Sequence, residues 1–218
     1  MVKVYAIAMC YNEIDIIEEF ISHVHRQDFD GLILLDHFSN DGTQMQLVKL
    51  QDELKADKTF DFQIFYTRNR SFDKVNKING MAAYAHFVAH SGRKGDTWIV
   101  PMDCDEFWQT DSNTPLAVKL KEEEAFFYNC FYNHMRNYMN TAVGYDKYYL
   151  APSDKRQQLR NEKCCFIWDE DIWATSGYHN LMSKPRFPFQ LSEPGDILLE
   201  SLCNLPALNP VLLHRGGC

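Results

Sequence analysis

Apolar and polar positions alternate along the first half of the chain in blocks of two kinds. Short apolar runs of strand length are separated by longer segments in which apolar residues recur every three or four positions. The predicted strands are residues 2–9, 32–35, 62–67 and 98–101, and helices are predicted after residues 12 and 43 and over residues 74–90. Strands and helices that alternate in this way form parallel sheets with right-handed crossovers. The pattern therefore predicts an open α/β sheet, mostly parallel and flanked by helices, of the nucleotide-binding kind.

The starts of the first two helices are predicted from their capping residues. Asn12 precedes a helix whose apolar positions include Ile17 and Phe20. Asp15 stands where a capping box has its acid. The turn of residues 39–43 precedes the second helix. The residues of that helix that are predicted to face inward include Met45, Val48 and Leu54.

The pattern weakens after Asp111. Thr114 and Pro115 predict the start of a short helix, and strands are predicted over residues 126–131 and 163–168. The C-terminal tail is interrupted by Pro and Gly and has no clear period. The second half is therefore predicted to be a smaller and less regular region.

Polar clusters follow three of the predicted strands. They are Asn12-Glu13, residues 36–43 and residues 103–106. In open α/β sheets, ligands bind beyond the carboxyl ends of the strands. The sequence therefore predicts that the three clusters converge on one crevice.

The third cluster contains the strongest chemical signal. Asp103 and Asp105 flank one residue, so both can face one space if the backbone bends there. Pro101 is unusual in a central strand, since it donates no hydrogen bond, and it is predicted to mark that bend. Two hard oxygen donors suit Mg²⁺ or Mn²⁺ together with a diphosphate. The alternative interpretation is a solvated acidic turn.

Composition and charge narrow the class of protein. The 218 residues are 45% hydrophobic and 24% charged, which fits a globular chain with a core, and the net charge of −8 disfavours a wide nucleic-acid surface. The seven cysteines contain no C-x-x-C pair, so we expect free thiols in a reducing compartment. No segment resembles a signal peptide or a bilayer span. These features predict a cytoplasmic protein, with peripheral docking on a membrane left open.

Three sequence blocks occur in a recognisable order. They are Asn12-Glu13, Ser39-Asn40-Asp41-Gly42-Thr43 and Asp103-Cys104-Asp105-Glu106-Phe107. With the strand pattern, they make the first half of the chain resemble the GT-A-type glycosyltransferases, in the family-2-like branch that carries DxDEF. The resemblance implies a GT-A-like fold, with residues 1–111 as the half that binds a nucleotide-diphosphate-sugar. Residues 112–218 would be the acceptor-binding and catalytic-completion half of the same single domain.

The resemblance also implies roles for individual residues. Asp36 and the loop after the first strand would contact the base, Asp103 the ribose or an Mn²⁺ or Mg²⁺ ion, and Asp105 the ion directly. A late histidine would complete the metal site, and we prefer His179, beside Gly177, to His214. The predicted donor-binding residues are Asn12, Glu13, Asp36, Asp41, Lys77 and Asp103, and the predicted metal ligands are Asp103, Asp105, His179 and His214. This chain departs from the family pattern at His37, where many members have an acid or Asn.

The chemistry that the resemblance implies is transfer of a hexose or pentose, from a UDP-sugar in the first instance, to an acceptor hydroxyl. Arg68, Arg70 or Lys77 could add positive charge near the phosphates, although an ordinary solvated face also explains each of them. An inverting reaction needs a carboxylate base, a retaining one does not, and the sequence leaves the stereochemistry open. The run Asp169-Glu170-Asp171 follows an apolar strand and suits this role, unless it is a surface turn. Glu106 is the rival, although it could instead orient the metal site.

Two other functions compete with this interpretation. A sugar nucleotidyltransferase needs a basic Gly-rich loop after the first strand, where this chain has Cys10-Tyr11-Asn12-Glu13. A non-catalytic nucleotide-sugar-binding module would keep the fold without turnover. The chain has no convincing Q-x-x-R-W segment, which argues against processive synthesis. A glycan, a protein, a small molecule and a modified nucleic-acid base all remain candidate acceptors, and the sequence leaves the oligomeric state open.

Overall fold

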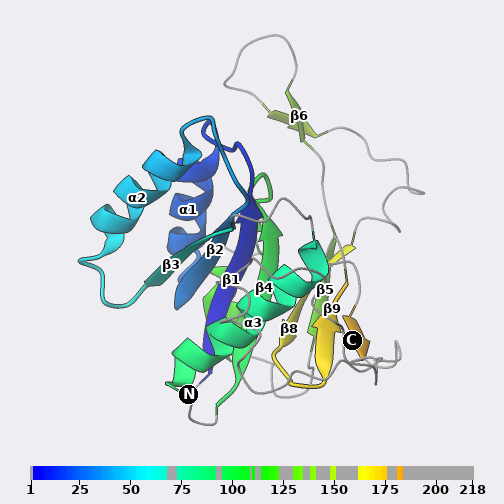
Figure 1. Ribbon diagram of the computed structural model, residues 1–218. Helices are drawn as coiled ribbons and strands as arrows, with labels where there is room; N and C mark the ends of the chain where they lie inside the picture. Colours follow the sequence, from blue (N-terminus) through cyan, green and yellow to red (C-terminus); the bar gives the residue numbers. More distant parts are fainter. Residues whose placement is uncertain are drawn as a thin grey trace.

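The computed structural model describes residues 2–67, 73–91, 95–108, 110, 114–122, 130–134, 138–140, 148–150, 162–175 and 181–183. These residues form a twisted six-stranded sheet with helices on both faces (Figure 1). The strands of this sheet are β1 (Lys3–Cys10), β2 (Gly31–Asp36), β3 (Asp61–Tyr66), β4 (Thr97–Asp103), β5 (Cys130–His134) and β8 (Glu162–Ile167). The helices are α1 (Ile17–Arg26), α2 (Thr43–Leu54), α3 (Lys74–His90) and α4 (Leu116–Glu122). Two small antiparallel pairs join β6 (Tyr138–Asn140) to β7 (Tyr148–Leu150) and β9 (Ile172–Ala174) to β10 (Leu181–Ser183).

The strand order of the large sheet is β3-β2-β1-β4-β8-β5. The first four strands in this order are parallel, whereas β8 runs antiparallel to both β4 and β5. The predicted α/β class with a mostly parallel, GT-A-like sheet is confirmed. The chain leaves β1 on one side to form β2 and β3, and α3 then carries it to the other side to form β4. The carboxyl ends of β1 and β4 therefore border the point where the strand order reverses.

The two faces of the sheet carry separate apolar cores. Alternate residues of β1 point to opposite faces, so that Val4, Ala6 and Ala8 join one core and Tyr5, Ile7 and Met9 the other. Residues of α1, α2 and α4 cover the first face, and α3 covers the second. Since β1, β2 and β4 are buried on both sides, they read as continuous apolar runs in the sequence.

The start of α1 and part of the buried face of α2 differ from the prediction. α1 begins at Ile17, because Asn12 takes a left-handed conformation (φ 56°) and does not cap the helix. α2 begins at Thr43, as the turn before it predicts. Leu54 packs against the core as predicted, but Met45 is 76% exposed and Val48 51% exposed. The buried residues of the helix are Thr43, Leu47 and Leu50.

α3 has the predicted bounds, and it holds part of the second half of the chain. The carboxylate of Asp73 caps its start by accepting a hydrogen bond from the backbone N–H of Asn76. The side chain of Asn79 donates to the carbonyl of Ala174 (3.0 Å) and accepts from the N–H of the same residue (2.9 Å). This pair of bonds fixes β9 against the helix.

β4 extends beyond the predicted strand, to Asp103. Its pairing with β8 covers Trp98 and Ile99 and stops before Pro101, which cannot donate to a ladder. Beyond that point, the described strand that pairs with β4 is β1, up to the register Met9–Asp103.

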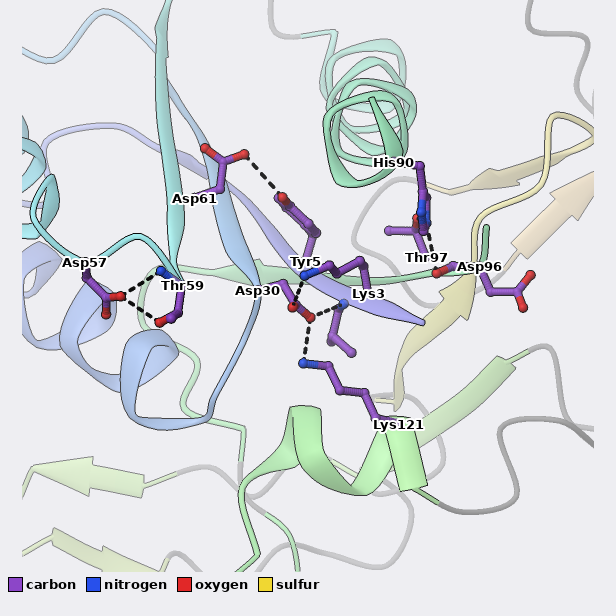
Figure 2. A network of polar contacts seen from close by, with 11 residues as sticks. Lys3, Tyr5, Asp30, Asp57, Thr59, Asp61, His90, Asp96, Thr97 and Lys121 are labelled. Atoms are coloured by element: carbon purple, nitrogen blue, oxygen red, sulfur yellow. Dashed lines mark hydrogen bonds and ion pairs between the residues drawn. The ribbon is translucent and has the colours of Figure 1, made fainter. Parts of the chain in front are cut away.

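A network of ion pairs and hydrogen bonds lies at the amino edge of the sheet (Figure 2). Asp30, just before β2, accepts from the ammonium groups of Lys3 and Lys121, each at 2.7 Å, and from the N–H of Val4 at 2.9 Å. The hydroxyl of Tyr5 donates to Asp61 (3.2 Å). Burial, followed by the negative charge of Asp61, raises the pKa of Tyr5. This edge joins β1, β2, β3 and α4.

Four cysteines in the described part of the chain, Cys10, Cys104, Cys164 and Cys165, are free and buried. No helix that the structure describes is both long and apolar enough to cross a membrane.

Candidate functional site

Three loops leave the carboxyl edge of the sheet at neighbouring points. β1 ends at Cys10, which pairs with Asp36 at the end of β2, and Met9 pairs with Asp103 at the end of β4. The register therefore brings together the three polar clusters that follow these strands, as predicted.

Hydrogen bonds join the first of these loops to the second. The N–H of Asn12 donates to the hydroxyl of Ser39 (2.8 Å), and the side-chain oxygen of Asn12 accepts from the N–H of Asn40 (2.9 Å). The left-handed backbone of Asn12 permits both contacts, since Asn tolerates this conformation better than most residues. Asn12 is therefore a structural link between the loops as well as a predicted donor-binding residue.

Asp41 makes a second link between these loops. Its carboxylate accepts from the N–H of Ile14 (3.1 Å) and from both the N–H (3.0 Å) and the hydroxyl (2.6 Å) of Thr43. The hydroxyl of Thr43 also accepts from the N–H of Glu13 (2.9 Å). The Ser-x-Asp-Gly-Thr block thus holds the loop after β1 in place at the start of α2.

Asp36 and Lys77, two predicted donor-binding residues, are both buried. Asp36 accepts from the side chain of Gln44 (2.6 Å) and the N–H of Ser39 (3.2 Å). The ammonium of Lys77 lies 3.3 Å from Nδ1 of His37. An ammonium can only donate, so this contact requires an acceptor at Nδ1 and places the proton of a neutral His37 ring on Nε2. Both predicted residues therefore lie beneath the surface of this edge and hold the loop residues around them.

Asp103 is held by two lysines from distant parts of the chain. The ammonium of Lys74, at the start of α3, lies 2.8 Å from Oδ1, and that of Lys163, on β8, lies 2.7 Å from Oδ2. Burial alone would raise the pKa of Asp103, but the hydrogen bonds from Lys163 and Lys74 outweigh it and lower this pKa. Burial likewise opposes the charge of Lys163, yet its bonds to Asp103 and Glu106 raise its pKa. Asp103 is therefore ionised at neutral pH.

The residues after Asp103 form a tight turn. The N–H of Glu106 donates to the carbonyl of Asp103 (3.0 Å), and the N–H of Asp103 donates to the carboxylate of Glu106 (3.1 Å). Cys104 is buried, and its thiol donates to the carbonyl of Met9 (3.6 Å). Asp105 is exposed at the tip of the turn, and within the described residues its carboxylate has no hydrogen bond or ion pair.

Glu13 lies near enough to the acidic motif to be affected by its charge. Partial burial raises the pKa of its carboxyl group, and the negative charge of Asp105 raises it further. Oxygen donors of this kind suit a hard divalent cation. The residues that the structure describes contain no group of three or more His, Cys, Asp or Glu side chains arranged to hold a metal ion. The predicted ligands His179 and His214 lie outside the described residues.

The structure does not bring Asp169, Glu170 and Asp171 to this edge. They follow β8, whose end pairs with the beginning of β4, and the N–H of Trp168 donates to the carbonyl of Thr97 (2.8 Å). The length of β4 separates them from Asp103 by about 20 Å. The prediction took the polar end of an apolar strand as the ligand-binding end, which holds only for the parallel strands. The structure therefore does not support these three residues as the acceptor base.

Lys74 and Lys163 are site residues that the sequence reasoning missed. Lys163 is the first residue of the predicted strand 163–168 and the polar residue of an otherwise apolar run, and this was the available signal. Its relation to Asp103 follows only from the antiparallel direction of β8. Arg68 and Arg70 lie outside the described residues.

Solved structures of one protein match part of this chain. S. aureus TarS, residues 1–349, is 19% identical with a TM-score of 0.34, over 57% of this chain and 32% of the TarS chain. The same TarS fragment in complex with UDP-GlcNAc is 18% identical (TM-score 0.32, 47% of this chain and 26% of that chain), and in complex with UDP it is 20% identical (TM-score 0.30, 47% and 27%). The chain thus spans about a third or less of the length of these TarS structures.

No curated protein matches the sequence. A family model described as "Glycosyl transferase family 2" matches residues 5–172, which include all the described strands of the large sheet except the first residues of β1. The chain therefore belongs to glycosyl transferase family 2.

Proposed function

We propose that this chain is a glycosyltransferase that binds a nucleotide-diphosphate-sugar at the carboxyl edge of β1, β2 and β4 and transfers the sugar to an acceptor hydroxyl. The observation that supports this most is the acidic turn of residues 103–106, which presents the exposed Asp105 beside Glu13 at the point where the strand order reverses. Membership of the family agrees with this location. A UDP-sugar is the first donor to test.

The loops after β1 and β2 offer surfaces for the nucleoside. Tyr11 is 54% exposed and Phe38 43% exposed, although large aromatic side chains usually bury. Aromatic rings stack on bases with about 1–3 kcal/mol for each base. We propose that these two rings bind the base, and that Asn12, Asp36 and Asp41 hold the loops that carry them.

The diphosphate would lie over the acidic turn. Asp105 would hold an Mn²⁺ or Mg²⁺ ion, which takes its remaining ligands from phosphate and water, and His179 or His214 stays a predicted further ligand. Such an ion supplies Lewis-acid stabilisation of the leaving diphosphate. Asp103 has a lysine on each carboxylate oxygen, so we propose that it orients the site or contacts the ribose.

The reaction exchanges one bond to the anomeric carbon for another. The bond from this carbon to the diphosphate oxygen breaks, and the oxygen keeps the electron pair. Negative charge therefore grows on the leaving group while the sugar becomes oxocarbenium-like. The oxygen of the acceptor hydroxyl forms the new bond, and its proton passes to water or to the leaving diphosphate. Lys74, with 18% of its side chain exposed at the start of α3, is the described cation placed to stabilise the leaving diphosphate.

Ligand-dependent thermal stability tests this proposal. A ligand that binds only the folded state raises the melting temperature. At a hundredfold excess over Kd, it raises the free energy of unfolding by about 2.7 kcal/mol. UDP with Mn²⁺ should stabilise the wild-type protein, and Asp105→Ala should abolish this gain. Glu170→Gln is the matched control, because Glu170 is also exposed but lies at the other end of the sheet. If no nucleoside diphosphate shifts the melting temperature, the proposal fails, and hydrolysis of the bound donor separates an enzyme from a binding module.

A further inference from the structure

Lys163 connects the two ends of the acidic turn from the far half of the chain. Its ammonium lies 2.7 Å from Oδ2 of Asp103 and 2.8 Å from Oε1 of Glu106. The side chain of Lys163 is 5% exposed and that of Glu106 is 10% exposed. One cation thus lies between two carboxylates that are three residues apart in the sequence, and it offsets the repulsion that would otherwise open the turn.

Each side of the turn of residues 103–106 is held by a different contact, and Lys163 holds the side next to β8. Cys104 is fixed through its thiol on the carbonyl of Met9, which belongs to β1. The backbone bond from Glu106 to Asp103 closes the turn at 3.0 Å. The ion pairs of Lys163 with Asp103 and Glu106 join the turn to β8. With the turn held in this way, Asp105 is exposed at its tip.

We propose that Lys163 is a positioning residue for donor binding, which fixes the turn of residues 103–106 so that Asp105 faces the diphosphate of the donor. This inference rests on the proposed function. Because Lys163 is almost fully buried behind Asp103 and Glu106, it acts through them and touches no reacting atom. Lys74 differs in this respect, since 18% of its side chain is exposed and it can contact a ligand itself.

The chain supplies a matched control for this lysine. Lys121 lies 2.7 Å from Oδ2 of Asp30, a distance equal to that between Lys163 and Asp103, but at the amino edge of the sheet (Figure 2). Lys121→Met removes an ammonium from a carboxylate that keeps a second lysine, as Lys163→Met does at Asp103. A purely structural role for both lysines predicts that both variants lose stability and keep their affinity for the donor.

The experiment measures the dissociation constant of UDP and of UDP-sugar by calorimetry, with Mn²⁺, well below the melting temperature of each variant. We expect Lys163→Met to bind about tenfold to a hundredfold more weakly, because a small misplacement of a binding group has effects of this size. Lys121→Met should stay within about twofold of the wild type. Lys163→Arg keeps the charge and should recover part of the lost affinity. Wild-type affinity in Lys163→Met, or an equal loss in Lys121→Met, would overturn the inference.

A double variant tests the mechanism. In the absence of the lysine, Glu106→Gln removes one of two repelling carboxylates, so Lys163→Met/Glu106→Gln should bind the donor more tightly than Lys163→Met alone, whereas Glu106→Gln by itself should weaken binding. Additive losses would contradict the positioning role. Failure of the proposed function has a different signature, because the wild-type protein itself would then bind no nucleotide, and that result would overturn both proposals.

Discussion

At each edge of the sheet, one aspartate lies between two lysines, but the surroundings of the two aspartates differ. At the amino edge, Asp30 lies between Lys3 and Lys121, and at the carboxyl edge Asp103 lies between Lys74 and Lys163. All four distances from ammonium nitrogen to carboxylate oxygen are 2.7 or 2.8 Å. In both places, an aspartate next to a parallel strand collects cations from elements that are far apart in the sequence.

The difference lies in the carboxylates around each aspartate. At the amino edge, Asp57 accepts from His25 and Thr59, and Asp61 accepts from Tyr5 (Figure 2 shows the pairs with Thr59 and Tyr5). At the carboxyl edge, Asp105 has no such partner within the described residues, and it raises the pKa of Glu13 beside it. The carboxylates of the amino edge are thus paired in a network that stabilises the fold, whereas Asp105 at the carboxyl edge stays exposed, as the proposed donor site requires.

The two central aspartates give the largest expected contrast. Asp103→Asn should lower donor turnover by about two to three orders of magnitude, or about 3–4 kcal/mol, because the site loses the anion that orders both of its lysines. Asp30→Asn should leave turnover within about twofold and lower the free energy of unfolding by about 1–3 kcal/mol. Steady-state kinetics and urea unfolding of both variants measure these effects. Equal losses of turnover would remove the functional difference between the edges.

The glycines at the two edges should differ in stability. A Cβ at Gly31 would lie 2.5 Å from the carbonyl oxygen of Asp61 and 2.4 Å from the ring of Tyr5. Gly31→Ala should therefore lower the free energy of unfolding by about 2–3 kcal/mol. Gly42 has φ 107°, but its nearest neighbour would be 3.8 Å away, at Ile14. Gly42→Ala should lower stability by about 1 kcal/mol, through backbone strain alone. Chemical denaturation gives both values, and a larger effect at Gly42 would contradict the close packing of the amino edge.

The amino edge should also give the protein its sensitivity to acid through His86. This ring stacks on Trp168, and its pKa is lowered to about 4, first by burial and then by the charge of His90, against a smaller opposite effect of Asp96. In the unfolded chain His86 binds a proton near pH 6.5, whereas in the folded protein it does so only near pH 4. Protonation therefore favours the unfolded chain, and the free energy of unfolding falls as the pH drops from about 6.5 towards about 4.

Because the His86 ring is partly exposed, we expect this loss to be about 1–2 kcal/mol. His86→Phe keeps a ring on Trp168 and cannot titrate, so its stability should change less over this range. Urea unfolding of both proteins between pH 4 and pH 7.5 measures the difference. Parallel pH profiles would show that His86 makes no such contribution.

The smallest effect is expected at the three acids after β8. Glu170→Gln and Asp171→Asn should change donor turnover by less than about twofold, because β8 places them at the amino edge. Steady-state kinetics with donor and acceptor provides the measurement. A tenfold loss in either variant would show that this turn reaches the acceptor, and the separation of roles between the edges would then fail.

The sequence predicted the sheet well where each strand is a local feature. β1 to β4 and α3 follow from apolar runs and helical spacing, since strands that are buried on both faces need continuous apolar residues. The face of α2 was predicted only in part. Leu54 packs against the core, but Met45 and Val48 are apolar and exposed, since hydrophobicity alone does not show which apolar stripe meets a sheet.

The candidate site was predicted in part, for a related reason. Asp103 and Asp105 follow from the end of a parallel strand, and the register of β1 with β4 joins them to the other two loops. Lys163 and the position of Asp169 depend on the antiparallel direction of β8, which is a property of the sheet as a whole. A local pattern shows that a strand exists, but its direction is set by tertiary pairing.

Pro101 has a consequence for the way the two halves of the chain meet. Since the ladder between β4 and β8 stops before it, ammonium–carboxylate contacts, and no longer backbone bonds, connect these strands near the crevice. The pyrophosphate of the proposed donor would carry charge of the same sign as Asp103 and could compete with it for the partly exposed ammonium of Lys74. On the proposed function, donor binding would then leave Lys163 as the main partner of Asp103, and the contact of β4 with β8 near the crevice would depend on this one ion pair.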